Sequence, residues 1–189
     1  MIRHAIRLLT VAGLLLAAAP LAASQWQIEH GESRLGFTAT QQGGEFTGRF
    51  DRFKAEMRFD PDDLAGSRFD VTVDVTSVNT GSSQRDRYLP DEEWFHTDDY
   101  PKATFVTTEF RHLEGERYEA DGELTIKGNT RAITLPFTWT IDGDNATMDG
   151  EVTLDRTNYG VGTGDWSAGD TVGLEVTVHV ELTLRRKEG

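Results

Sequence analysis

Residues 172–184 read VGLEVTVHVELTL, and every second position is apolar. A period of two places successive side chains on opposite faces of a β-strand. One face of this segment carries mainly valine and leucine, whereas the other carries threonine, glutamate and histidine. We therefore predict a strand with one dry side and one wet side. At about 3.4 Å per residue, it would span roughly 40 Å.

The same alternation recurs earlier in the chain. It is clear in four stretches, residues 70–76, 118–127, 133–141 and 148–155. It is less regular in three others, residues 34–40, 46–59 and 103–112. The apolar positions change parity within 46–59, which predicts a bulge or bend near Asp51–Arg52. Phe105 and Phe110 have opposite parity, so the pattern leaves undecided which of them points inward.

Short turn signals separate these stretches, for example Gly43-Gly44, Lys127-Gly128-Asn129 and Asp142-Gly143-Asp144. Short turns favour antiparallel hairpins. We count about eight long strands, a number that closes naturally into an up-and-down barrel. The sequence therefore predicts an all-β fold, an extended eight-stranded antiparallel barrel. A two-sheet sandwich is the competing fold, since it would share the alternation.

One connection, residues 79–102, is too long for a hairpin turn. It offers a serine N-cap, Ser82 or Ser83, for one helical turn and an acidic run at 91–93 for the start of a second. Links of this length in compact domains are usually functional or disordered. Because this one contains three aromatic residues near its end, we predict a helical-turn lid that folds over one end of the barrel and gates access.

The first 24 residues have the pattern of a cleaved signal peptide. Arg3 and Arg7 form a positive start, residues 8–23 are apolar, and small residues continue to Ser24. This pattern directs a protein out of the cytoplasm and is then removed. We predict a signal peptide over 1–24 and a single β-barrel domain over 25–189.

The chain is acidic and contains no cysteine. Its formal charge is −13, which becomes −15 without Arg3 and Arg7. Such a charge repels nucleic acid and anionic lipid head groups, so we predict no nucleic-acid partner. Without cysteine there is no disulfide and no reactive thiolate. Because the acidic surface repels anionic head groups, any bound lipid is expected inside the barrel.

An eight-stranded barrel lies between a packed core and a cavity for one ligand. Small inward residues such as Ala39, Gly48 and Gly122 leave room, but the alternation alone leaves a filled barrel equally open. The candidate tunnel residues are apolar side chains with inward parity. They are Phe37, Phe50, Phe53, Met57, Val73, Leu124, Leu135, Phe137, Trp139, Val152, Leu154, Val176 and Val178.

Arg156 continues the inward parity of Val152 and Leu154. A buried arginine is costly unless its charge is paired and its donors are satisfied. Arg156 is therefore either a head-group anchor for a phosphate, carbonyl or carboxylate, or a structural residue bonded to Asp86 or to loop carbonyls. The candidate residues for the head group or tunnel mouth are Arg85, Asp86, Trp94, Phe95, Arg156 and Trp166.

The lid segment also contains potential metal ligands, namely Glu92, Glu93, His96, Asp98 and Asp99. Their spacing matches no metal-binding loop, so we interpret them as a solvated acidic surface and predict no metal site. The sequence contains no nucleophile elbow, phosphate loop or zinc-helix motif. We therefore predict no catalysis and no cofactor.

Short stretches across the chain carry a family resemblance. They are WQI at 26–28, GRF at 48–50, RD at 85–86, WF at 94–95, GELTIKGNT at 122–130, LDR at 154–156 and YGVG at 159–162. In this order they resemble the YceI-like family of periplasmic, lipocalin-like, polyisoprenoid-binding proteins, over about residues 25–185. The resemblance implies a lipocalin-like barrel with an apolar tunnel for polyprenyl chains, isoprenoid quinones or fatty-acid derivatives.

The leading hypothesis is periplasmic binding, storage or transport of a long amphiphilic lipid, a polyisoprenoid or an isoprenoid quinone. The resemblance implies transient contact with a membrane or a membrane b-type cytochrome, and the oligomeric state stays open, a dimer included. Two alternatives remain. One is a filled barrel that serves as a stress or protein-interaction module. The other is a lipid-modifying enzyme with Arg85, Asp86 and Arg156 as its polar group.

Overall fold

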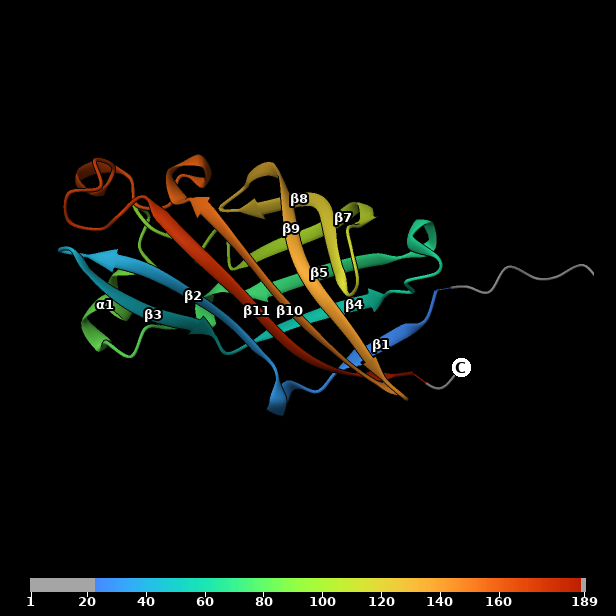
Figure 1. The fold of residues 1–189 in the computed structure, drawn as a ribbon. Coiled ribbons are helices and arrows are strands. Elements are labelled where there is room, and N and C mark those ends of the chain that lie inside the picture. Colours follow the sequence, from blue (N-terminus) through green and yellow to red (C-terminus); the bar gives the residue numbers. More distant parts are fainter. Residues whose placement is uncertain (1–22, 188–189) are drawn as a thin grey trace, which may run out of the picture.

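The computed structural model describes residues 23–187, so the predicted signal peptide lies outside the described residues except for Ala23 and Ser24. The described part is almost entirely β-structure (Figure 1). Its strands are β1 (Gln25–Ile28), β2 (Arg34–Gln41), β3 (Gly44–Phe50), β4 (Phe53–Arg58), β5 (Arg68–Asp74), β6 (Val78–Asn79), β7 (Lys102–His112), β8 (Arg117–Ile126), β9 (Asn129–Asp142), β10 (Asn145–Asp155) and β11 (Glu175–Arg186). The helical elements are α1 (Ser83–Tyr88) and the 3-10 helices η1 (His30–Glu32), η2 (Leu64–Gly66), η3 (Val75–Ser77), η4 (Arg156–Tyr159) and η5 (Gly164–Trp166).

Three pairs of strands behave as single, interrupted strands. Both β1 and β2 pair with β11, and on their other side β1 pairs with β4 and β2 with β3. In the same way β4 pairs with β5 and β3 with β6. When each interrupted pair counts once, eight antiparallel strands remain, and β1 closes the ring between β4 and β11. The predicted eight-stranded barrel is confirmed, and a two-sheet sandwich is not formed.

Local irregularities explain where the alternation changed parity. The strand path is interrupted between β3 and β4 at Asp51–Arg52, where the bend was predicted. In β7, the register against β8 shifts between Thr107 and Glu109, which marks a bulge. The extra residue lets both Phe105 and Phe110 face the interior, which the sequence pattern had left undecided.

β9 and β10 pair along only part of their length, from the hairpin up to Phe137 opposite Gly150. The Trp139 N–H donates to the Glu116 carbonyl beside β8 at 2.9 Å, so odd-numbered β9 residues bond toward β8 and even-numbered ones toward β10. The next residue due to bond to β10 is Pro136, which has no N–H. The ladder stops there, and Figure 1 shows the two strands separating beyond that point.

The long connection is folded, as predicted. The Ser82 hydroxyl accepts a hydrogen bond from the Arg85 N–H at 3.4 Å and caps α1. The second predicted helical turn is wrong, because residues 91–99 form consecutive turns instead. We call residues 80–101, between β6 and β7, the lid. Within residues 23–187, no helix has the length and apolar character needed to cross a bilayer.

One end of the barrel is solidly filled by aromatic side chains. Phe59 is fully buried, with ring centroids 4.7 Å from Trp139 and 5.1 Å from Tyr118. Phe137 packs in the same cluster. The prediction that Phe137 and Trp139 line a tunnel is therefore wrong. Their parity is inward, as expected, but they lie at a level of the barrel where opposing rings fill the interior.

Candidate functional site

Between this aromatic core and the lid, the barrel contains an apolar cavity of about 150 Å³, which we call the larger cavity. Every side chain that lines it is aliphatic, aromatic or methionine. Nine of the predicted tunnel residues lie on its wall, namely Phe50, Phe53, Met57, Val73, Leu124, Leu135, Val152, Leu154 and Val178. A cavity of this size and lining stays dry and accepts a small apolar group. It can hold hydrocarbon but offers nothing to orient a polar group.

A second cavity of about 100 Å³, the smaller cavity, lies under the lid and the loop that follows η4. It contains two more of the predicted tunnel residues, Phe37 and Val176. It also gathers four of the six predicted mouth residues, which are Arg85, Trp94, Arg156 and Trp166. Two arginines and no carboxylate occur among the described residues of its lining, although the chain as a whole is strongly acidic. The smaller cavity is therefore positively charged.

Three phenylalanines separate the two cavities. Phe50 lines the larger cavity and Phe37 lines the smaller one, and their ring centroids are 5.7 Å apart. Phe95, from the lid, also lines the larger cavity, and its ring centroid is 6.1 Å from that of Phe50. We call these three rings the divider. Because Phe95 was expected at the mouth, its position at the boundary between the cavities corrects that expectation.

The divider is held in place by a glycine. Phe37 pairs with Gly48 on β3, and a Cβ at Gly48 would lie 2.3 Å from the Phe37 ring. The ring therefore rests on the bare backbone, as aromatic rings often do opposite glycine in sheets. We expect Gly48→Ala to force the ring aside and to lower the free energy of unfolding by about 1–3 kcal/mol, which urea unfolding would measure. An unchanged midpoint would show that the ring has room to move.

Arg156 is buried, and all five of its N–H groups donate to backbone carbonyls. The acceptors are Gly173, Val161, Gly162, Trp166 and Val172, at distances between 2.5 and 2.9 Å. Arg156 is therefore a structural residue and not a head-group anchor. Its partners are loop carbonyls rather than Asp86. Burial lowers the pKa of Arg156 from its ordinary value, yet an arginine stays charged in proteins. It contributes positive charge to the smaller cavity but no spare donor.

Arg85 is the better candidate to meet a polar ligand. It makes three hydrogen bonds to the described residues, to the Thr80 hydroxyl and carbonyl and to the Gln41 side chain, at 3.1–3.2 Å. A guanidinium has five N–H groups, so two are left for another acceptor. The guanidinium carbon Cζ of Arg85 lies 4.2 Å from the centre of the Phe46 ring, and this contact orients the charge.

Asp86 acts on this site indirectly. Its carboxylate accepts from the Thr80 N–H at 3.0 Å and the Thr80 hydroxyl at 2.6 Å. Thr80 in turn accepts from Arg85 through its hydroxyl oxygen and its carbonyl. Asp86 is not among the residues that line either cavity, so it positions Arg85 through Thr80.

Trp94 supplies an unused donor. It is buried and lines the smaller cavity, and its indole N–H has no acceptor among residues 23–187. A buried donor without a partner costs about 1–3 kcal/mol, and in a native protein it is often explained by a missing ligand or water. The smaller cavity therefore combines an unsatisfied donor with spare guanidinium N–H groups, which suits an oxygen-rich acceptor.

The lid is attached to the loop after η4. The Glu93 carbonyl accepts from the Gly162 N–H at 2.7 Å and the Thr163 N–H at 2.9 Å, and its carboxylate accepts from Trp166 Nε1 at 2.9 Å. Lys127 Nζ donates to the Glu92 carbonyl at 2.5 Å and to the Gly160 carbonyl at 2.8 Å. In the described part of the chain no three acidic or histidine side chains gather as a metal site would require.

Sequence reasoning missed several wall residues. Ile126 and Ile133 line the larger cavity, and their inward parity was visible in the sequence. Phe105 also lines it, but the bulge in β7 concealed its direction. Gln41 and Thr80 line the smaller cavity, and nothing in the alternation marks a polar residue at a strand end as part of a site.

Comparison with known proteins places these features in a family. A YceI-like domain model matches residues 26–184. UPF0312 protein plu2095 from Photorhabdus laumondii is 32% identical over 130 residues, 67% of each chain. Protein YceI from Escherichia coli O157:H7 is 30% identical over 140 residues, 72% of this chain and 73% of that protein.

Solved structures share the fold. BcnA from Burkholderia cenocepacia has a TM-score of 0.80 at 30% identity, with 83% of this chain and 99% of that chain covered. A polyisoprenoid binding domain from Saccharophagus degradans has a TM-score of 0.68 at 16% identity, with 87% and 99% covered. The second similarity shows the common fold alone.

Proposed function

Because the chain belongs to the YceI-like family, we propose that it binds one long amphiphilic lipid, a polyisoprenoid or an isoprenoid quinone, and stores or carries it in the periplasm. The observation that carries the proposal is the pair of adjacent cavities, one wholly apolar and one rich in donors. The hydrocarbon chain occupies the larger cavity, and an oxygen-bearing end occupies the smaller one. Burial of apolar surface at about 25 cal/mol per Å² supplies most of the affinity.

The ligand joins the two cavities by displacing the divider. Neither cavity reaches the roughly 300 Å³ at the lower end of ordinary ligand pockets. Rotation of Phe37, Phe50 and Phe95 opens one continuous space, while the aromatic core at the far end limits how deep the chain can reach. The polyisoprenoid-binding domain with the same fold agrees with this class of ligand.

The lining favours binding over catalysis. The polar side chains of the smaller cavity are Gln41, Thr80, Arg85, Tyr88 and Arg156, to which the Trp94 indole adds a donor. They can hold an acceptor, but a general base beside a nucleophile is not among them. A lipid-modifying enzyme is therefore the weaker hypothesis. A protein-interaction module is also weaker, because it needs no apolar cavity.

A matched pair of tryptophan variants tests the proposal. Val152 lines the larger cavity, whereas the next residue, Thr153, faces outward and is exposed. We expect Val152→Trp to fill the cavity and weaken binding of geranylgeraniol to delipidated protein at least tenfold, and Thr153→Trp to change it less than twofold. Native mass spectrometry of the complexes measures both. Equal affinities for the two variants, or no binding to the unmodified protein, would contradict the proposal.

A further inference from the structure

The barrel wall contains a slot between β9 and β10. Residues 129–136 of β9 pair with β8 alone, and residues 151–155 of β10 pair with β11 alone. Unpaired strand edges are a liability that closed barrels normally remove. Here two facing edges remain open in the middle of the sheet, because Pro136 has no N–H for the next hydrogen-bonded pair.

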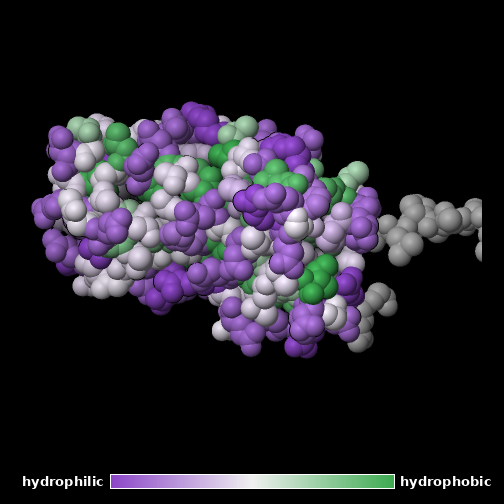
Figure 2. All heavy atoms as spheres, viewed as in Figure 1, coloured by the Kyte–Doolittle hydropathy of each residue, from purple (hydrophilic) through white to green (hydrophobic). Residues whose placement is uncertain are grey.

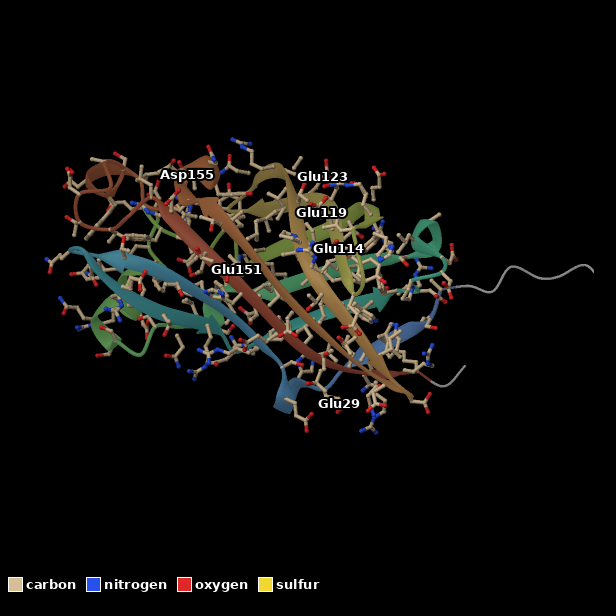
Figure 3. The ribbon with its side chains drawn as sticks, in the orientation of Figure 1. Glu29, Glu114, Glu119, Glu123, Glu151 and Asp155 are labelled. Carbon is tan, nitrogen blue, oxygen red and sulfur yellow. The ribbon has the colours of Figure 1, made fainter. Side chains whose placement is uncertain are left out.

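The two ends of the slot are firmly closed. At the end nearer the β9–β10 hairpin, which is the lower end in Figure 1, Phe137 pairs with Gly150. A Cβ on Gly150 would lie 3.2 Å from the Pro136 carbonyl oxygen, so the glycine lets the strands approach closely. At the upper end the Asn129 side chain donates to the Tyr159 carbonyl in η4 at 3.0 Å. The slot is thus an unpaired stretch of limited length, and Figure 3 shows Glu151 and Asp155 along its β10 edge.

Behind the slot lies the larger cavity. Ile133 and Leu135 line the cavity from the β9 edge, and Val152 and Leu154 line it from the β10 edge. Leu135 is buried, but the other three are only partly buried. Figure 2 shows hydrophobic side chains at the surface where β9 and β10 separate, surrounded by hydrophilic ones. The apolar interior therefore reaches the surface through the wall.

The lid end offers a more obstructed route to the same cavity. Five hydrogen bonds donated by Gly162, Thr163, Trp166 and Lys127 to Glu92 and Glu93 hold the lid to its surroundings. Beyond the lid, a chain would still have to pass the divider to reach the larger cavity. The slot bypasses the lid, and it lets the hydrocarbon enter the larger cavity before the divider opens.

We propose that the lipid chain enters and leaves the larger cavity sideways, through the slot between β9 and β10, while the lid stays closed. The inference rests on the proposed function. The upper boundary of the slot is η4, which also carries Arg156 of the smaller cavity, so the polar end of the chain stays beside its site.

Two cross-links separate the routes. If the hairpin register continued, Thr134 would face Thr153 across the slot, and both side chains are exposed. Glu92 on the lid lies next to Glu93, whose carbonyl bonds to Thr163. Since the chain has no cysteine, the double variants Thr134→Cys/Thr153→Cys and Glu92→Cys/Thr163→Cys can each be bridged by the same short bis-maleimide.

The measurement is the rate at which cis-parinaric acid, a fluorescent fatty acid of 18 carbons, loads into delipidated protein in a stopped-flow instrument. We expect the bridge across the slot to slow loading at least tenfold and the bridge on the lid to change it less than twofold. Unbridged double variants are the controls. Slow loading with a bridged lid and normal loading with a bridged slot would overturn the proposal.

A single substitution gives an independent test. Pro136→Thr supplies the missing N–H toward β10. Threonine also suits the outward-facing side-chain position, since the neighbouring outward residues Thr134 and Thr138 are threonine. We expect the ladder to extend, the slot to narrow and loading to slow several-fold. Unchanged loading in both this variant and the slot-bridged protein would refute the slot as the route. Failure of the unmodified protein to bind both geranylgeraniol and cis-parinaric acid would instead refute the proposed function, and this inference would fall with it.

Discussion

Replacing Arg156 with methionine is expected to lower the free energy of unfolding by about 3 kcal/mol or more. Hydrogen bonds to a charged group contribute about 1.5–3 kcal/mol each, and Arg156 makes five of them to the carbonyls of one loop. Methionine matches the apolar stem but leaves those carbonyls without donors. Because the contributions are not additive, the expected loss is well below their sum.

Urea unfolding at pH 7, followed by tryptophan fluorescence, measures this loss. Trp94 and Trp166 lie beside Arg156 and report on its loop. Arg85→Met is the matched control, since Arg85 is only half-buried and makes three hydrogen bonds. We expect the control to lose about 1 kcal/mol. Equal losses in the two variants would show that the carbonyl cluster does not hold the loop.

Arg156 also illustrates what the sequence can predict. Its inward direction followed correctly from the parity of Val152 and Leu154. Its role did not follow, because the acceptors come from residues 161–173, whose irregular loop has no periodic pattern. The direction of a side chain is local information, whereas its hydrogen-bond partners depend on how a loop folds back.

The barrel itself was predictable because alternation records a dry and a wet face at every strand. The interruptions of the first three strand paths were only partly visible, and the bend at Asp51–Arg52 was the clearest of them. The slot was not predicted. Pro136 stood within a regular alternation, and its missing N–H matters only once β10 is known to lie on that side.

Whether the interior is hollow could not be read from parity. Trp139 and Leu124 both point inward, yet one lies in the solid core and the other lines the larger cavity. The difference depends on the height of each residue in the barrel and on the size of the side chains opposite it. Those heights are set by strand register, which the sequence pattern does not specify beyond each hairpin.

The second large effect is expected where the barrel is filled. Phe59→Ala should lower the free energy of unfolding by about 3–5 kcal/mol, the usual cost of removing a buried aromatic ring. Phe59 is fully buried and packs against Phe69, Phe110, Tyr118, Phe137 and Trp139. Its removal leaves a hole that these rings cannot close, since each is fixed by other neighbours.

Val178→Ala is the comparison, because Val178 lines a cavity that already exists. Removing its two methyl groups enlarges that space and should cost only about 1–2 kcal/mol, near the transfer value of the lost carbons. Urea unfolding of both variants measures the difference. Geranylgeraniol binding should survive in both, because the lining of the larger cavity stays apolar. If Val178→Ala proved as costly as Phe59→Ala, the end assigned to the ligand would be as tightly packed as the core, and the division of the barrel into a filled and a hollow half would be wrong.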